Sequence, residues 1–184
     1  MRFLALGDSY TIGESVPPAE RWPVQLAALL RQEGFALDDP LSIATTGWTT
    51  DELWAGIDRA SPQGMFDLVS LLIGVNNQYR GWDEEEYRAQ FVELLERAIG
   101  FAGGVAARVV VLSIPDWSVT PFASGRDHAA IAATIDRFNT LNREETARLG
   151  AHYVDVTPAS RRAAQDPTWL ANDGLHPSGN MYAE

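Results

Sequence analysis

The chain has 184 residues, and its 14 basic residues are all arginine, against 25 acidic residues and no cysteine. Without lysine or cysteine it can form no lysine Schiff base, no Walker A phosphate loop, no thiol nucleophile, no disulfide and no cysteine-ligated zinc site. The net charge of −11 argues against nucleic acid and anionic membranes as partners, because it repels their phosphates.

The length predicts one domain over residues 1–184, and 46% hydrophobic residues can form a core without disulfides or metals. No apolar run approaches the roughly 20 residues that span a membrane. The run at residues 3–6 is too short for the apolar region of a signal peptide. We therefore expect a soluble, cytoplasmic protein, or a secreted one whose signal peptide preceded Met1. The composition does not indicate an oligomeric state.

Short apolar runs and longer amphipathic stretches alternate along the chain. The predicted elements, in chain order, are a strand at 3–6, a helix at 22–33, a strand at 41–45, a helix at 50–57, a strand at 68–73, a helix at 84–98, a strand at 109–114, a helix at 128–149 and a strand at 152–156. Gly34, Asp83 and Gly150 mark helix ends. Because the strands are almost continuously apolar, they predict a parallel sheet covered by helices on both faces.

Small and polar residues follow each predicted strand. In an open parallel sheet, ligands bind beyond the carboxyl ends of the strands. The segments that reach this edge are residues 7–13, 46–50, 74–77, 115–117 and, near the chain end, 173–177. Any chemistry of the chain is therefore expected in these five segments.

Ser9 is the candidate nucleophile, and a serine hydroxyl needs an adjacent base. His176 is the best base, because Asp173 lies three residues earlier in a turn that can bring its carboxylate to the imidazole ring. The carboxylate would hold the Nδ1–H tautomer and leave Nε2 free to take a proton. The other histidines, His128 and His152, are expected to have surface or packing roles.

An oxyanion intermediate needs preorganised hydrogen-bond donors. The backbone N–H groups of Ser9 and Gly47 and the side-chain amide of Asn76 are the candidates. Two plainer roles remain open on the residues alone. Gly47 can simply make a turn, and Asn76 can cap a helix or bend a loop.

The segments resemble, in order, the blocks of the SGNH hydrolases, the GDSL-type esterase and lipase superfamily. The matching positions are Gly7-Asp8-Ser9-Tyr10, Gly47, Asn76 and Asp173-Gly174-Leu175-His176-Pro177. The resemblance covers essentially the whole chain. It implies a three-layer α/β/α flavodoxin-like sandwich with a five-stranded parallel sheet. It also implies hydrolysis of a carboxylic ester by a Ser9–His176–Asp173 triad through an acyl-enzyme, without a metal or an organic cofactor.

The chain departs from the superfamily pattern in three places. Asn77 stands where the third block often has aspartate, and Ser42 stands near a position where the second block often has asparagine. Only eight residues follow His176, whereas superfamily members usually continue into a longer closing helix. Either the protein is short, or the printed sequence lacks most of that helix, which Met181 and Tyr182 could begin.

Aromatic residues are frequent in the segments beyond the strands. They are Trp48, Tyr79, Trp82, Trp117 and Phe122. These rings could wall an apolar acyl or aryl pocket, stack on the sugar of an acetylated carbohydrate, or belong to the core. Asp8 is expected to be a structural hydrogen-bonding residue, and Arg80 is expected to form a surface salt bridge.

The function predicted best is that of a serine ester hydrolase, a GDSL-type esterase with lysophospholipase-like or similar activity on a small-molecule ester. A carbohydrate O-acetyl esterase of the same superfamily is the first alternative. A catalytically silent binding module would lose part of the triad, which is complete here. A flavodoxin-like nucleotide or phosphate binder would need neither Asp173 nor His176, and the acidic charge disfavours it.

Overall fold

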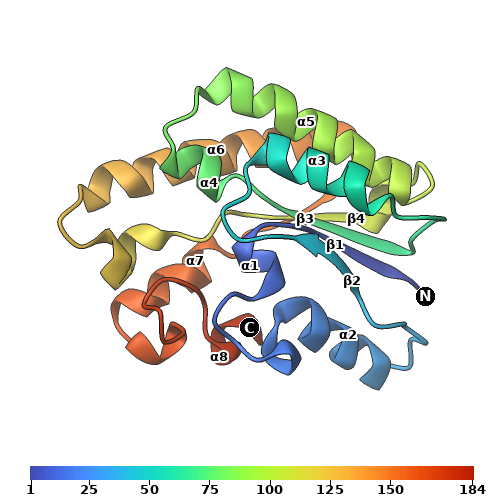
Figure 1. The fold of residues 1–184 in the computed structure, drawn as a ribbon, viewed down its shortest axis with the longest axis horizontal. Helices are drawn as coiled ribbons and strands as arrows, with labels where there is room; N and C mark the ends of the chain where they lie inside the picture. Colours follow the sequence, from blue (N-terminus) through green and yellow to red (C-terminus); the bar gives the residue numbers. More distant parts are fainter.

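The computed structural model describes all 184 residues, which form one five-stranded parallel sheet with helices on both faces (Figure 1). The strands are β1 (Phe3–Gly7), β2 (Leu41–Ala44), β3 (Leu68–Leu72), β4 (Val109–Leu112) and β5 (His152–Val154). Their spatial order is β2-β1-β3-β4-β5, the flavodoxin-like order. The predicted fold class is therefore confirmed.

The α-helices lie between and after the strands. They are α1 (Ser9–Ile12), α2 (Trp22–Gln32), α3 (Thr50–Ala60), α4 (Val75–Tyr79), α5 (Glu84–Phe101), α6 (His128–Leu149), α7 (Thr157–Ser160) and α8 (Gly179–Tyr182). The four helices predicted from apolar spacing are all present as α2, α3, α5 and α6. None of the helices combines the length and the apolar character needed to cross a bilayer.

The register of the central strands aligns the segments that follow them. Gly7 at the end of β1 pairs with Ala44 of β2 on one side and with Leu72 of β3 on the other. Because the three strands are parallel and end at the same level, the loops after them emerge side by side. This edge carries Ser9, Gly47 and Asn76.

The larger part of the core lies between the sheet and helices α3, α5 and α6, which cover one face (Figure 1). Tyr87, Phe91, Leu94, Leu95 and Ala98 form the buried stripe of α5. Their 3–4-residue spacing is that of an amphipathic helix, and β-strand side chains fill the space opposite them. This side of the molecule is closely packed and holds the sheet edge in place.

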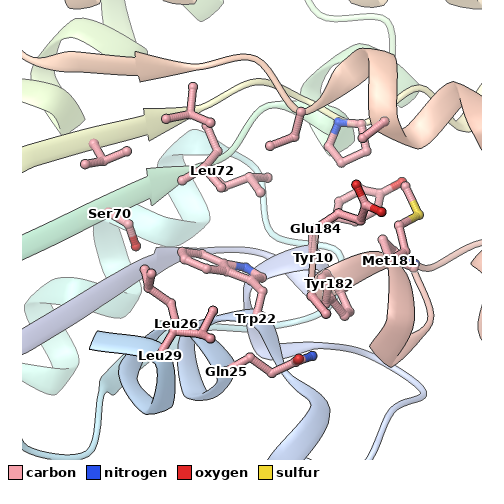
Figure 2. Close-up of a pocket in the computed structure, with 18 of the residues that line it drawn as sticks. Tyr10, Trp22, Gln25, Leu26, Leu29, Ser70, Leu72, Met181, Tyr182 and Glu184 are labelled. Carbon is pink, nitrogen blue, oxygen red and sulfur yellow. The ribbon is translucent and has the colours of Figure 1, made fainter. Parts of the chain in front are cut away.

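The opposite face of the sheet is less completely covered. A smaller cluster there includes Phe3, Trp22 and Leu37. Beside it, a groove of about 480 Å³ lies between α2, the sheet and α8 (Figure 2). Parallel strands are normally buried on both faces, yet Val154 of β5 is 46% exposed here. The groove is mainly apolar and lies on the sheet face rather than at the edge where the strands end.

Four strands end earlier than their apolar runs predict, β2 and β3 by one residue and β4 and β5 by two. The run at 109–114 ends as β4 at Leu112, because the side-chain amide of Asn139 bonds both the N–H of Ile114 (2.7 Å) and its carbonyl (3.0 Å). The run at 152–156 ends at Val154, since the N–H of Val156 donates to the Ser113 hydroxyl instead (2.8 Å). Side chains thus replace strand partners at this edge.

Candidate active site

Ser9 is the first residue of α1, and only Asp8 separates it from the end of β1. Asp8 caps this short helix, with its Oδ1 accepting from the N–H of Tyr10 (3.0 Å). The turn before it is tight, because a Cβ on Gly7 would lie 2.3 Å from the carbonyl oxygen of Leu72. Only glycine fits there, and the turn presents the Ser9 hydroxyl at the sheet edge.

The structure brings Ser9, His176 and Asp173 into one hydrogen-bonded chain. His176 Nε2 lies 2.8 Å from Ser9 Oγ, and His176 Nδ1 lies 2.7 Å from Asp173 Oδ2. The Tyr10 ring packs edge-on against the imidazole, with 5.4 Å between the ring centroids, and His176 is only 7% exposed. An imidazole held in this way keeps its proton on Nδ1 and offers Nε2 to the serine.

Asp173 is held by its own turn. Its Oδ1 accepts from the backbone N–H groups of Leu175 and His176, both at 3.0 Å. Partial burial alone would raise the pKa of this carboxyl. Hydrogen bonds from the His176 ring, the Ser15 hydroxyl and the two amides outweigh burial and lower the pKa to about 2. Asp173 is therefore ionised at neutral pH, as the acid of such an arrangement must be.

Three hydrogen-bond donors lie in the segments beside Ser9. The Ser9 N–H is at the first position of α1, where no carbonyl of the helix can accept it. Gly47 has a φ of +85°, and its N–H donates to no group of the chain. Asn76 Nδ2 donates one proton to the Trp48 carbonyl (2.9 Å) and has a second proton to offer. The bond to Trp48 also connects the segment after β2, which carries Gly47, to the segment after β3, which carries Asn76.

Arg80 holds the loop that carries Gly47 through a hydrogen bond. The guanidinium donates to the Gly47 carbonyl (2.7 Å) and lies 3.3 Å from the Glu52 carboxylate. Glu52 in turn accepts from the N–H of Thr49 (2.9 Å) in a capping box at the start of α3. The predicted surface salt bridge of Arg80 is present, and it also fixes the loop that carries Gly47.

The departure at Asn77 has a clear physical reason. Its Oδ1 accepts from the N–H of Thr50 (3.2 Å), and its Nδ2 donates to the Thr50 hydroxyl (2.8 Å). The Thr50 hydroxyl donates its own proton to Gln90 Oε1 (2.6 Å), so it can only accept from position 77, and a carboxylate has no proton to donate. The fully buried amide therefore joins α4 to α3 without placing a charge in the core.

Changing each of the two neighbouring asparagines to alanine is expected to have a different effect, on turnover for Asn76 and on stability for Asn77. Asn76→Ala removes one proposed oxyanion donor, so kcat is expected to fall roughly 10²–10³-fold with little change in unfolding free energy. Asn77→Ala leaves buried Thr50 groups unpaired, so the protein is expected to lose roughly 1–3 kcal/mol of stability. Ester turnover and urea unfolding on both variants check this, and a stable Asn76→Ala enzyme with full turnover would remove Asn76 from the site.

A cavity of about 130 Å³ opens on the hydrogen-bonded chain. It is lined by Ser9, Tyr10, Val75, Asn76, Tyr79, Trp117, Phe122, Leu175 and His176. Of the aromatic residues predicted for a pocket, it includes Tyr79, Trp117 and Phe122. Trp48 and Trp82 are not among the lining residues. The Trp48 ring packs instead on α3, where a Cβ on Gly56 would lie 2.2 Å from it.

The rings of Tyr79, Trp117 and Phe122 pack on one another. The centroid of the Tyr79 ring lies 5.6 Å from that of Trp117 and 6.0 Å from that of Phe122. Arg126 covers them, with its guanidinium carbon 4.8 Å from the Tyr79 ring centroid and its Nη2 donating to the Tyr79 hydroxyl (2.8 Å). Tyr79 and Phe122 each remain 44% exposed, so the cavity wall continues outward as an open aromatic rim.

Sequence reasoning did not identify several residues at this site. Tyr10, Val75 and Leu175 line the cavity, and Ser15 contacts the acid. Tyr10 and Leu175 adjoin predicted residues, so their neighbourhood was a usable signal, but nothing in the sequence around Ser15 marked it. His128 and His152 are exposed, as expected. No group of three or more His, Asp or Glu side chains is arranged to hold a metal ion.

Asp8 is completely buried next to Ser9, and its Oδ2 has no hydrogen-bond partner. Burial raises the pKa of Asp8 to about 7, against the opposing hydrogen bond from the Tyr10 N–H. In the unfolded chain the value is the ordinary 3.8. Between about pH 4 and pH 7 the folded state therefore binds the extra proton, so this group makes stability fall as the pH rises through that window.

Asp8→Asn is expected to remove this pH dependence, because the amide is a neutral match for the protonated carboxyl. The variant should equal the parent near pH 4 and exceed its unfolding free energy by roughly 1–3 kcal/mol at pH 8. Urea unfolding at both pH values tests this, with Asp127→Asn, an exposed helix cap, as the matched control. A stability difference that is the same at pH 4 and pH 8 would show that burial does not hold Asp8 protonated.

The chain is similar in sequence and in fold to several known proteins. An arylesterase of Vibrio mimicus is 25% identical over 179 residues, which cover 96% of this chain and 80% of the relative. The crystal structure of TesA superposes with a TM-score of 0.73 at 17% identity, over 99% of this chain and 92% of that one. Axe2, an acetylxylan esterase from Geobacillus stearothermophilus, superposes with a TM-score of 0.72 at 19% identity, over 98% and 88%.

The family comparison covers nearly the whole chain. The model of the GDSL-like lipase/acylhydrolase family matches residues 5–184, from within β1 to the last residue. The match spans the strand-end segments that carry Ser9, Gly47, Asn76, Asp173 and His176. The protein is therefore a carboxylic ester hydrolase that belongs to the GDSL-like lipase/acylhydrolase family.

Proposed function

We propose that the protein hydrolyses esters of short acyl groups through an acyl-enzyme formed on Ser9. The observation that carries the proposal is the continuous chain from Asp173 through His176 to Ser9, with bonds of 2.7 and 2.8 Å, at the wall of a small cavity. A serine hydroxyl becomes a competent nucleophile when a positioned base can take its proton.

The proposed reaction has two halves. Ser9 Oγ attacks the ester carbonyl carbon while His176 Nε2 takes the hydroxyl proton, and Asp173 stabilises the resulting imidazolium. The Ser9 N–H, the Gly47 N–H and the Asn76 amide hold the oxyanion. The tetrahedral intermediate then expels the alcohol, which receives the proton from His176. In the second half, His176 takes a proton from water as the water oxygen attacks the acyl carbonyl carbon. The second tetrahedral intermediate then expels Ser9 Oγ, which takes that proton back from His176, and the carboxylic acid leaves.

The size of the cavity supports short acyl groups. A volume of about 130 Å³ equals roughly four water-sized groups, which matches an acetyl to butyryl chain. The walls contributed by Val75, Trp117 and Leu175 are apolar and suit such a group. A long acyl chain would need a pocket of several hundred cubic ångströms.

The exposed rim supports a second candidate, removal of acetyl groups from carbohydrate. Tyr79 and Phe122 present ring surface at the mouth of the cavity, where a sugar or an aryl leaving group could stack. The arylesterase relative and the acetylxylan esterase neighbour carry the corresponding activities in their names. An acetyl group in the cavity and a ring on the rim fit both substrates.

A matched substrate panel tests the proposal. The p-nitrophenyl esters of acetate, butyrate, octanoate and palmitate are compared with acetylated xylo-oligosaccharides at equal concentration. We expect the highest kcat/KM on acetate or butyrate and at least a tenfold fall by octanoate. Highest activity on palmitate would contradict the cavity argument. Acetate release from the sugars above that from p-nitrophenyl acetate would favour the carbohydrate esterase.

A further inference from the structure

The loop that follows α1 touches the acid of the site. Ser15 Oγ donates a hydrogen bond of 2.7 Å to Asp173 Oδ2, across 158 positions of sequence. The same oxygen accepts the 2.7 Å hydrogen bond from His176 Nδ1. Ser15 is thus the one side chain besides the histidine that holds Asp173.

With this bond, both oxygens of Asp173 have two donors each. The backbone amides of Leu175 and His176 occupy Oδ1, and the imidazole and the Ser15 hydroxyl occupy Oδ2. A carboxylate has about four lone-pair sites, so all of them are used. The Asp173 side chain is 29% exposed, and without Ser15 a mobile water would take the fourth site and compete with His176 for Oδ2.

Ser15 holds this position in an unfavourable backbone conformation. Its φ is +65°, and only one other non-glycine residue, Ser61, has a positive φ. The loop is held by the Glu14 N–H, which donates to the Ser9 carbonyl (3.0 Å), and by the hydrogen bond from the Thr46 hydroxyl to the Glu14 carboxylate. A non-glycine residue in this region is strained, and such strain is concentrated at functional sites.

We propose that Ser15 is a positioning residue for ester hydrolysis, which fixes the Asp173 carboxylate toward His176 and keeps water from its Oδ2. The proposal rests on the proposed function of the Ser9–His176–Asp173 site. Ser15 touches neither the substrate cavity nor Ser9 Oγ, so it acts through Asp173 alone.

Two substitutions at position 15 separate positioning from backbone structure. Ser15→Gly removes the hydroxyl and relieves the strained backbone, so we expect unchanged or higher stability together with a roughly 3–10-fold lower kcat and an unchanged KM. Ser15→Thr keeps the hydroxyl but strains a β-branched residue, so we expect lower stability with kcat within about twofold of the parent. If Ser15 had only a structural role, Ser15→Gly would keep more activity than Ser15→Thr.

The pH dependence of kcat/KM separates the two roles further, because a change in backbone strain alone would leave it unaltered. Without the Ser15 donor, Asp173 loses one of the hydrogen bonds that lower its pKa, so the acidic limb of kcat/KM should move to higher pH in Ser15→Gly. Of the other titratable side chains near the site, Tyr10 and Tyr182 stay neutral in this range because burial raises the pKa of each phenol. Asp8, whose pKa burial raises to about 7, titrates in the parent and in Ser15→Gly alike, so the comparison of the two profiles isolates the effect of Ser15.

Ser61→Gly is the matched control, since it relieves the same type of backbone conformation at the end of α3, and it should leave the profile unchanged. Parental kcat and an unmoved acidic limb in Ser15→Gly would overturn the proposal, and so would an equal loss in Ser61→Gly. The NMR chemical shift of the His176 Nδ1 proton, which bonds Asp173 Oδ2, reads the Ser15 effect without any substrate. If the parent turned over no ester, only the proposed function would fail, and a changed Nδ1 proton shift in Ser15→Gly would still support positioning by Ser15.

Discussion

Ser9→Ala is expected to lower kcat for p-nitrophenyl acetate by roughly 10⁴–10⁶-fold, the largest effect of any single substitution in this protein. The change removes the oxygen that would form the acyl-enzyme, and no other hydroxyl lies within hydrogen-bond distance of His176 Nε2. The residual rate would come from the oxyanion donors and from binding, which alone give about 10³–10⁴ over water.

The measurement combines kinetics with chemical labelling. A fluorophosphonate probe followed by peptide mapping should modify the parent at Ser9 and leave Ser9→Ala unlabelled. Thr134→Ala, which removes an exposed hydroxyl on α6, is the control and should be labelled like the parent. A label on another residue, or turnover in Ser9→Ala within tenfold of the parent, would contradict the assignment of the nucleophile.

Asp173→Asn is expected to lower kcat by roughly 10⁴-fold while leaving the fold intact. The backbone N–H groups of Leu175 and His176 both need an acceptor at Oδ1, so they fix the orientation of the new amide. Its Nδ2 must then face His176 Nδ1 and donate to it. The proton of the imidazole moves to Nε2, which can no longer accept a proton from Ser9.

Steady-state kinetics and the pattern of histidine ¹⁵N chemical shifts check this prediction together. The shifts should show an Nδ1–H ring in the parent and an Nε2–H ring in the variant. Asp127→Asn, the same chemical change at an exposed helix cap, should keep parental kcat. Asp173→Asn with more than about a tenth of the parental kcat would mean that the carboxylate does not orient the base.

The elements of the fold could be predicted because each one has a local signal. The five strands are short apolar runs, and helices such as α5 carry buried residues at helical spacing, which only one face of a helix provides. The strand ends were less predictable. Ile114 and Val156 fit the runs but leave the sheet, because Asn139 and Ser113 supply their hydrogen bonds from elsewhere in the chain.

Much of the candidate site could also be predicted, for a topological reason. Parallel strands that end at one edge bring the segments after them together, so Ser9, Gly47 and Asn76 could be grouped before any distance was known. The turn from Asp173 to His176 is local, because an aspartate accepts from the backbone two and three residues later. The aromatic pocket was predicted only in part, since the side to which a loop ring such as Trp48 turns depends on packing.

The sequence by itself determined the parallel fold and the order of the blocks, and it predicted Ser9, His176 and Asp173 as nucleophile, base and acid. The fold follows from local periodicities, whereas the three roles follow from the spacing of Asp173 and His176 together with the resemblance to the SGNH hydrolases. Only the tertiary structure decided that Ser15 donates to Asp173, that burial raises the pKa of Asp8 to about 7, and that Tyr79 rather than Trp48 walls the cavity. Each of these depends on groups far apart in the chain, whose distance is set by sheet register and packing rather than by local sequence.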